Sequence, residues 1–327
     1  MSFEIGELHP NTPHLFADLA ELLLLVNNNG RNWLHANDLE SLLKRGAINS
    51  DELDEEEDAD HVDTSSADRN SRHEQQIEDV MIQLSYRAKT FEKSYPFTMH
   101  GDKIQLNAPL TERQRVYRFL LACSRLRSFG GNGIPQRWAK SFTELSRNAL
   151  QGLMPSYGQT RIFDANSVDR KNYYGTDLRK ALRVMGSDLG VIQTNDIECD
   201  KAGASGDAGF DLIATYNFED GAVTNYAVLG QCGAQETGWP KKTLEAHSIH
   251  LKSFFQVQLD YPSLMFSPVC YRNATGEWVS NKFTNGILLT DRGRIIQLIE
   301  VQEGFSEVVN TPWFTSFEKE FNSYLVD

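Results

Sequence analysis

Two apolar runs joined by a short polar loop place the tightest limit on how this chain can fold. The runs are Asp211–Tyr216 and Tyr226–Cys232, and the loop between them is centred on Gly221. Short apolar runs separated by a polar, glycine-containing loop predict two strands that pair antiparallel. Asp211 and Gln231 are equally far from the loop centre, so the pairing predicts that they lie opposite one another on one face of the sheet.

The elements around this hairpin predict an α/β domain with mixed sheet connectivity. The order is two helices, then several strands, with a further helix that begins near Pro240, a residue well suited to the first helical position. The expected helices are Trp138–Leu153 and Asp177–Leu189, and the other expected strands are Val191–Glu198, Gly286–Thr290 and Arg294–Val301.

The first part of the chain predicts a separate, mostly helical domain. Apolar residues at helical spacing indicate short helices within 13–47, a longer helix over Glu74–Phe91, and another that runs from Thr111 to about Leu126. The glycine-rich stretch at 129–133 interrupts all periodicity and is typical of a domain boundary. We therefore expect a regulatory or interaction domain over residues 1–129 and a second domain over residues 135–327.

The acidic charge of the chain is concentrated in one segment. The net charge is −13, but ten Asp or Glu and no Lys or Arg fall between Asp51 and Asp68, so the rest of the chain carries only −3. A segment this acidic and this poor in large apolar residues cannot offset the entropy cost of folding. We expect a disordered acidic insert at about 49–73, which is either a solvated loop or a segment that mimics DNA or shields a basic site until it is displaced.

The sequence favours a cytoplasmic protein with no membrane segment. The apolar run Leu22–Val26 is far shorter than the ~20 residues that cross a bilayer. The four cysteines are widely spaced and form no Cys-x-x-Cys pair, which argues against a zinc knuckle or a disulfide framework.

The helix after Thr111 carries several arginines. Arg115, Arg118 and Arg125 fall on one narrow face of that helix. Such a face could bind nucleic-acid phosphates, or it could be an ordinary solvated helix surface.

The open end of the predicted hairpin offers ligands for a metal ion. The carboxylate of Asp211 and the amide carbonyl of Gln231 are hard oxygen donors of the kind that Mg²⁺ binds, with Mn²⁺ as an alternative ion. Asp207 is either another acidic ligand or the cap of an irregular turn between Gly206 and Gly209. Asp211 could instead be a surface carboxylate of an edge strand, and Gln231 a buried amide bonded to backbone.

The motif around these residues resembles a known nuclease family. A Gly-Asp-x-Gly-x-Asp strand followed by a strand ending in Gln-Cys is similar to the Mrr-like restriction endonucleases of the PD-(D/E)xK superfamily. The likeness covers roughly Phe142 to Glu300. It implies a restriction-endonuclease-like core, with a mixed central sheet flanked by helices. Asp211 matches the family's strand carboxylate, Gln231 the glutamine of its Gln-x-Lys motif, and Glu144 the acidic residue of its first core helix.

The chain departs from the family at the motif lysine. Gly233 stands where the family has lysine, two residues after the glutamine. The sequence Trp239-Pro240-Lys241-Lys242 resembles a Trp-x-x-Lys pattern of members with Gln-Cys, so Lys242 is the expected replacement. Lys241 is then a candidate contact for nucleic acid. Both lysines could also be solvated residues at a helix start.

The resemblance implies a function in nucleic-acid cleavage. We expect a Mg²⁺-dependent endodeoxyribonuclease with a role in restriction or antiphage defence, whose partners are DNA and either a partner protein or further copies of the chain. The alternative is a catalytically inactive nuclease-like subunit that binds DNA or protein in a larger defence complex, which the glycine at position 233 keeps open.

Overall fold

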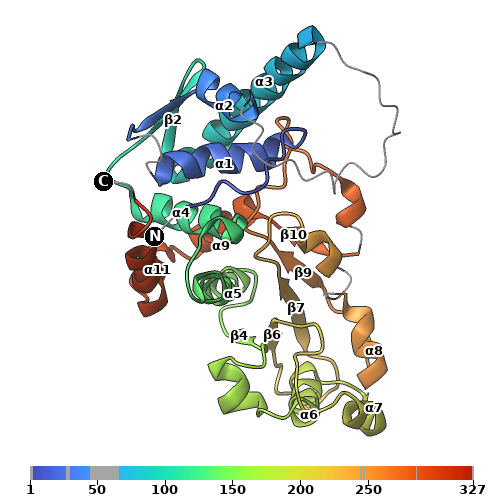
Figure 1. Ribbon diagram of the computed structural model, residues 1–327. Coiled ribbons are helices and arrows are strands. Elements are labelled where there is room, and N and C mark those ends of the chain that lie inside the picture. The colour runs from blue at the N-terminus through green and yellow to red at the C-terminus, as the bar shows by residue number, and fades with distance from the viewer. Residues whose placement is uncertain are drawn as a thin grey trace. The chain divides into compact units, whose positions relative to one another are not determined.

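The computed structural model describes residues 3–26, 30–44, 66–243, 245, 247–284 and 286–325. The chain divides into two compact units (Figure 1). Unit 1 comprises Met1–Trp138, Val269–Val279 and Val309–Asp327, and unit 2 comprises Ala139–Pro268 and Ser280–Val308. Compared with the expected domains 1–129 and 135–327, unit 1 extends to Trp138 and includes two later segments of the chain.

Unit 1 consists of helices and one small sheet. The strands β1 (Trp33–His35), β3 (Lys103–Leu106) and β2 (Phe97–His100) form an antiparallel sheet in that order. The helices are α1 (Pro13–Leu25), α2 (Ala36–Lys44), α3 (Ser66–Phe91), α4 (Glu112–Ser124) and α11 (Pro312–Asn322). The predicted mostly helical character of this part of the chain is confirmed.

Helix α1 is buried along its whole length, including two carboxylates. Asp18 and Glu21 are fully buried and form ion pairs of 2.7 and 3.0 Å with Arg87 of α3, which is itself fully buried. The hydroxyls of Tyr95 and Tyr117 donate to the two carboxylate oxygens of Glu21. Buried charges persist only when they are paired and hydrogen-bonded, so this network fixes how α1 packs on α3.

The centre of unit 2 is a mixed five-stranded sheet with the order β10-β9-β7-β6-β4. The strands β10 (Leu288–Thr290), β9 (Ser263–Phe266) and β7 (Tyr226–Cys232) are parallel, and β6 (Leu212–Tyr216) and β4 (Gln159–Ile162) continue the sheet antiparallel. The prediction of an α/β architecture with a mixed sheet is confirmed.

Helices cover both faces of this sheet. On one face, Ile213 of β6 and Leu229 of β7 pack in a buried cluster with residues of α6 (Leu178–Leu189) and α8 (Leu251–Phe254). On the other face, the thiol of Cys232 lies near the hydroxyls of Thr143 and Ser146, which belong to α5 (Ile134–Gln151). Strand side chains alternate between faces, which explains why β7 is buried on both sides.

Two of the predicted strands contain helix in the structure. The stretch predicted as Val191–Glu198 forms a two-residue strand, β5 (Gln193–Thr194), paired with β8 (Phe255–Gln256), and its last three residues belong to α7 (Asp196–Lys201), which the side chain of Asn195 caps. The stretch predicted as Arg294–Val301 lies entirely in α9 (Arg292–Val301), which the side chain of Asp291 caps.

Four short turns and one helix complete the described part of unit 2. They are the π-helical turn η4 (Arg170–Tyr174), the 3-10 turns η5 (Trp239–Lys242), η6 (Ser248–His250) and η7 (Asn281–Phe283), and α10 (Phe305–Val309). The helix predicted near Pro240 is thus a single 3-10 turn.

Most of the predicted acidic insert at 49–73 lies outside the described residues, namely its part 49–65. Its remainder, 66–73, forms the first turns of α3 and not a disordered segment. Helical residues therefore begin well before Glu74.

Among the residues that the structure describes, no helix combines the length and apolar character needed to cross a membrane. All four cysteines fall within these residues, are buried and form no disulfide.

Candidate metal centre

The pairing of β4 with β6 brings two aspartates to one edge of the sheet. Ile162 pairs with Leu212, so the residue pair just beyond it is Phe163 and Asp211. The backbone N–H of Phe163 donates to the carbonyl of Asp211 at 2.7 Å, which extends the ladder by one step. Asp164 follows directly and therefore lies beside the start of β6.

A tight loop brings a third aspartate to the same place. Gly206, Ala208 and Gly209 all have positive φ angles of 100°, 56° and 84°, which turns the chain back sharply before β6. Asp207 lies in this loop, and its Oδ1 accepts a hydrogen bond of 3.0 Å from the N–H of Gly209. Glycine at two of the three positions makes this turn accessible without a steric penalty.

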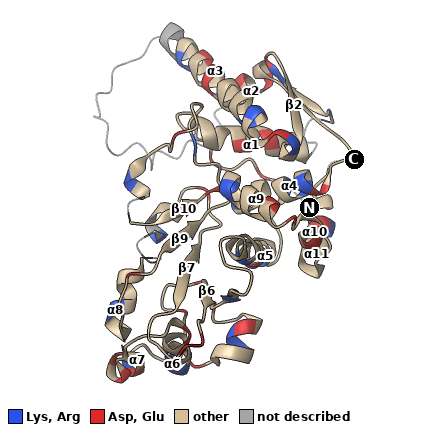
Figure 2. Cartoon of the chain, turned by 180° about the vertical axis from the view of Figure 1, so that it is seen from behind, with Lys and Arg blue, Asp and Glu red and all other residues tan. Residues whose placement is uncertain are grey.

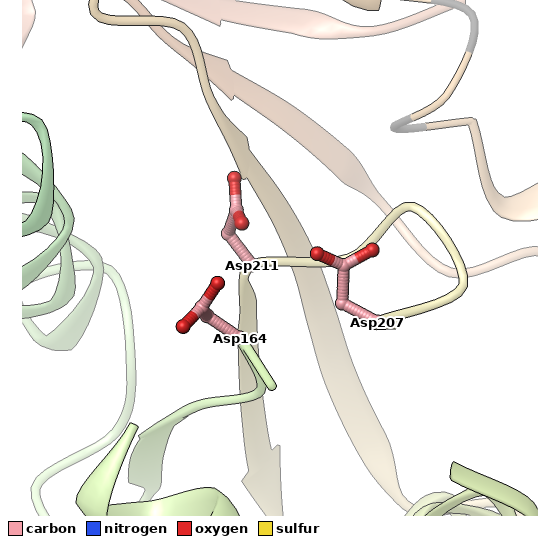
Figure 3. Close-up of side chains that lie close together, drawn as sticks. All are labelled: Asp164, Asp207 and Asp211. Carbon is pink, nitrogen blue, oxygen red and sulfur yellow. The ribbon is translucent and has the colours of Figure 1, made fainter. Parts of the chain in front are cut away.

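The carboxylates of Asp164, Asp207 and Asp211 form one cluster (Figure 3). One oxygen from each lies within 4.8 Å of the others, and all three side chains are half-buried. The three side chains come from three different segments: the end of β4, the loop before β6, and the first position before β6. Three carboxylates at this distance repel one another unless protons or a cation offset their charge.

Each carboxylate is held by one backbone hydrogen bond. Asp164 accepts from the N–H of Asn166 at 3.0 Å, Asp207 from Gly209, and Asp211 from Cys232 at 2.8 Å. The second oxygen of each carboxylate has no hydrogen bond to any described residue. The cluster therefore has three oriented side chains, each with an oxygen that can bind a ligand.

The environment of Asp211 strongly favours its protonated form. Burial raises the pKa of Asp211 from 3.8 to about 7; the N–H of Cys232 and the charge of Lys242 lower it, and Asp207 and Asp164 raise it further. A carboxylate whose pKa is raised by burial and by two neighbouring acids is a common feature of functional sites. A divalent cation would offset the same repulsion.

The charge of Lys242 lowers the pKa of Asp211. Lys242 ends the 3-10 turn η5, and its charge acts on both Asp211 and Cys232. The side chain of Lys241 lies outside the described part of the chain.

The absence of lysine at position 233 has a steric cause. A Cβ atom on Gly233 would lie 2.4 Å from Cε of Met265 and 2.7 Å from Cβ of Trp239, which is itself buried. Real Cβ atoms do not approach other atoms so closely, so no side chain fits here. The packing of Trp239 excludes a side chain at position 233, and Lys242 lies in the same 3-10 turn as Trp239.

The pairing of β6 with β7 follows the predicted register from Leu212 opposite Gly230 to Tyr216 opposite Tyr226. Beyond Leu212 the backbone N–H of Asp211 donates to the carbonyl of Gly230 at 3.0 Å, so the regular ladder ends there and the predicted opposition of Asp211 and Gln231 is not part of it. Gln231 is 5% exposed, and its Oε1 has no hydrogen-bond partner among the described residues. A buried amide oxygen without a partner in the described part of the chain is uncommon in folded proteins.

Glu144 is not part of this cluster. It lies on α5 and forms an ion pair of 3.6 Å with Arg147. Burial raises the pKa of Glu144, Arg147 lowers it and Asp169 raises it. The accessory role expected from the resemblance therefore has no support in the contacts that Glu144 makes.

Arg115, Arg118 and Arg125 do not form an open basic face. In unit 1, Arg115 and Arg118 of α4 both pair with Glu318 of α11, and acidic residues accompany basic ones on these helices (Figure 2). Arg125 is 3% exposed and donates to the carbonyls of Ile5 and Glu7. These contacts explain the arginines as structural residues and leave no phosphate-binding face of the predicted kind.

The sequence did not indicate that Asp164 belongs to the acidic cluster or that Arg170 is buried beside it. Arg170 donates to the carbonyl of Phe163 at 2.9 Å and stacks on the ring of Phe163, directly before Asp164. Burial lowers the pKa of Arg170, and the charges of Asp207 and Asp164 raise it. The signal was weak because β4 is short and polar, so that no strand was predicted ahead of Asp164.

The donor set fits a hard divalent cation. Asp164, Asp207 and Asp211 supply carboxylate oxygens, and Gln231 could supply an amide oxygen. Mg²⁺ and Mn²⁺ favour such ligands, whereas zinc sites are usually built from Cys and His.

Comparisons with protein-family models, with curated proteins and with solved structures found no match for this chain. Its function is therefore inferred from the site itself.

Proposed function

We propose that unit 2 is a metal-dependent nuclease that hydrolyses DNA phosphodiester bonds. The observation that carries this proposal is the cluster of Asp164, Asp207 and Asp211, whose carboxylate oxygens lie within 4.8 Å of one another beside the charge of Lys242. Acidic ligands at this spacing, together with the ammonium group of Lys242, suit a substrate that carries negative charge at the reacting atom.

Each residue has a distinct role in the proposed reaction. Asp211, Asp207 and Asp164 would hold Mg²⁺, with the amide oxygen of Gln231 as a further proposed donor. Such a site would supply neutralisation of charge on the phosphoryl oxygens and an activated water. Lys242 stabilises the negative charge that develops on the phosphoryl group as the bond to the leaving oxygen breaks.

The fold of unit 2 supports this assignment. Its mixed central sheet with helices on both faces agrees with the restriction-endonuclease-like core expected from the Gly-Asp-x-Gly-x-Asp and Gln-Cys motifs. The displaced lysine is consistent with the same resemblance, because Gly233 cannot carry a side chain. A role in restriction or antiphage defence follows from the resemblance, with DNA as substrate and unit 1 as the part that controls the site or binds a partner.

A cleavage assay tests the proposal. Purified full-length protein is incubated with supercoiled plasmid, linear duplex and single-stranded DNA in EDTA, Mg²⁺ or Mn²⁺. The expected result is cleavage that requires the divalent cation and is lost in Asp211→Asn. Asp220→Asn is the matched control, because Asp220 lies in the exposed loop between β6 and β7. Cleavage that persists in Asp211→Asn would show that this cluster is not the active site.

The second candidate is a nuclease-like unit that binds DNA or a partner protein without cutting. Gly233 favours it, since Trp239 and Met265 occupy the space of the family's lysine. Metal-dependent DNA binding with no product from any of the three substrates would support this reading over the first.

A further inference from the structure

A groove opens beside the aspartate cluster in unit 2. It has a volume of about 500 Å³, within the range of small-molecule sites. Its lining includes Asp207, so one wall of the groove is also part of the proposed metal centre. A substrate group in the groove would therefore lie next to the phosphate held at the cluster.

The wall that contains Asp207 exposes backbone atoms. Gly206, Ala208 and Gly209 have no side chain beyond Cβ, and their positive φ angles turn the peptide groups of the loop. Within the described residues, the N–H groups of Gly206, Asp207 and Ala208 have no hydrogen-bond acceptor. These N–H groups can donate to acceptor atoms of a flat ligand that approaches the loop closely.

The remaining walls combine an apolar surface with three polar side chains. Leu178 and Ala202 provide the apolar part, and Ser205, Glu245 and His250 provide the polar part. Glu245 is exposed, and its backbone N–H donates to the carbonyl of Lys242. The carboxylate of Glu245 only accepts hydrogen bonds when ionised, so a ligand group beside it must donate one.

We propose that this groove holds one unstacked nucleobase next to the cleaved phosphate, and that Glu245 selects a base with an exocyclic amino group. The inference rests on the proposed nuclease function and adds a substrate preference to it. A carboxylate accepts a hydrogen bond from the 4-amino group of cytosine but faces a carbonyl oxygen in uracil. A base in a groove must leave its stack, so the substrate has an unpaired or easily unpaired base at this position.

Cleavage of matched single strands tests this preference. Short oligodeoxynucleotides of deoxycytidine or deoxyuridine, which are both pyrimidines without a 5-methyl group, are cut by full-length protein in Mg²⁺. The wild type is expected to cut the deoxycytidine strand roughly five- to tenfold faster. In Glu245→Gln the ratio of the two rates should fall close to one, because a glutamine amide can also donate to the uracil oxygen. Glu307→Gln, an exposed change on α10, should keep the wild-type ratio.

The outcomes separate this inference from the nuclease proposal. Equal cleavage of the two strands by the wild type, or an unchanged ratio in Glu245→Gln, would overturn the base groove and leave the nuclease function standing. Cleavage of fully paired duplex with none of either single strand would also overturn it. No cleavage of any DNA in Mg²⁺ or Mn²⁺ would overturn both.

Discussion

The carboxylate of Asp211 accepts a 2.8 Å hydrogen bond from the backbone N–H of Cys232, across the pairing of β6 with β7. The backbone N–H of Asp211 also donates to the carbonyl of Gly230 at 3.0 Å, so two hydrogen bonds join Asp211 to the end of β7. The bond from Cys232 fixes the carboxylate at the open end of the hairpin, beside Asp164 and Asp207. These two contacts thus tie the proposed metal ligand to the end of the sheet.

Replacement of Asp211 should stabilise the metal-free protein at high pH. The pKa of Asp211 is raised to about 7 in the folded state, so the fold favours the protonated form and loses stability as pH rises from about 4 to 7. Asp211→Asn removes this penalty and keeps an acceptor for the Cys232 N–H. We expect a gain of up to about 4 kcal/mol near pH 8 and much less near pH 4.5.

Urea unfolding in EDTA at both pH values measures this difference. Asp220→Asn serves as the control, with the same change of charge in an exposed loop. An equal effect of Asp211→Asn at the two pH values would contradict the raised pKa.

Asp164 should be required for metal binding although no motif marks it. Its carboxylate is anchored by the N–H of Asn166 and has one oxygen without a hydrogen bond to the described residues. Asp164→Asn removes one of three charged ligands, so we expect Mn²⁺ to bind roughly tenfold or more weakly. Isothermal titration calorimetry gives the affinity, and wild-type affinity in this variant would remove Asp164 from the site.

A lysine restored at position 233 should harm the protein instead of improving it. The Cβ of any side chain there would overlap Met265 and Trp239. Gly233→Lys is therefore expected to cost at least about 1–3 kcal/mol of folding free energy, and it should not raise the cleavage rate. Gly304→Ala is the matched control, because its added Cβ meets only ordinary contacts of 3.5 Å and longer. A higher cleavage rate in Gly233→Lys would contradict this expectation and would mean that Trp239 can move to make room for the new side chain.

Lys242 should act through its charge. Lys242→Met removes the ammonium group that lowers the pKa of Asp211, so the acidic limb of the rate against pH should move upward. The rate at its optimum should fall by roughly 10² or more, with partial recovery in Lys242→Arg. Lys180→Met, on an exposed position of α6, controls for the loss of one positive charge. If the cleavage rate of Lys242→Met depends on pH in the same way as that of the wild type, the ammonium group of Lys242 has no role in the reaction.

Arg87 should determine the stability of unit 1. Its loss leaves Asp18 and Glu21 buried without their cation. We expect Arg87→Met to cost about 3–5 kcal/mol, whereas Arg127→Met at an exposed position should have little effect. Chemical denaturation followed by circular dichroism compares the two, and equal stabilities would show that the network is dispensable.

The sequence predicted the elements whose signals are local and strong. Tyr226–Cys232 is a strand with the predicted bounds because its apolar run is uninterrupted. Helix α6 begins after Asp177, whose side chain accepts from the N–H of Arg179. In contrast, the spacing of Ile295, Ile296 and Ile299 is compatible with both a strand and a helix. The helix forms because the side chain of Asp291 caps its first turn.

Only some residues of the candidate site could be predicted from the sequence. Asp211, Asp207 and Lys242 belong to local patterns that the sequence shows directly. The register of β6 and β7 follows the prediction up to Leu212 and Gly230, one residue short of Asp211 and Gln231. Asp164 joins the cluster through the pairing of β4 with β6, a contact between distant parts of the chain that no local signal encodes. Glu144 fits the motif by sequence position, but its side chain pairs with Arg147.

Anomalous diffraction from crystals soaked in Mn²⁺ tests the central claim most directly. The account predicts a peak bounded by the carboxylates of Asp164, Asp207 and Asp211 in the wild type, and none there in Asp211→Asn. Well-ordered crystals with a bound Mn²⁺ at another site, and no peak among these three side chains, would contradict it.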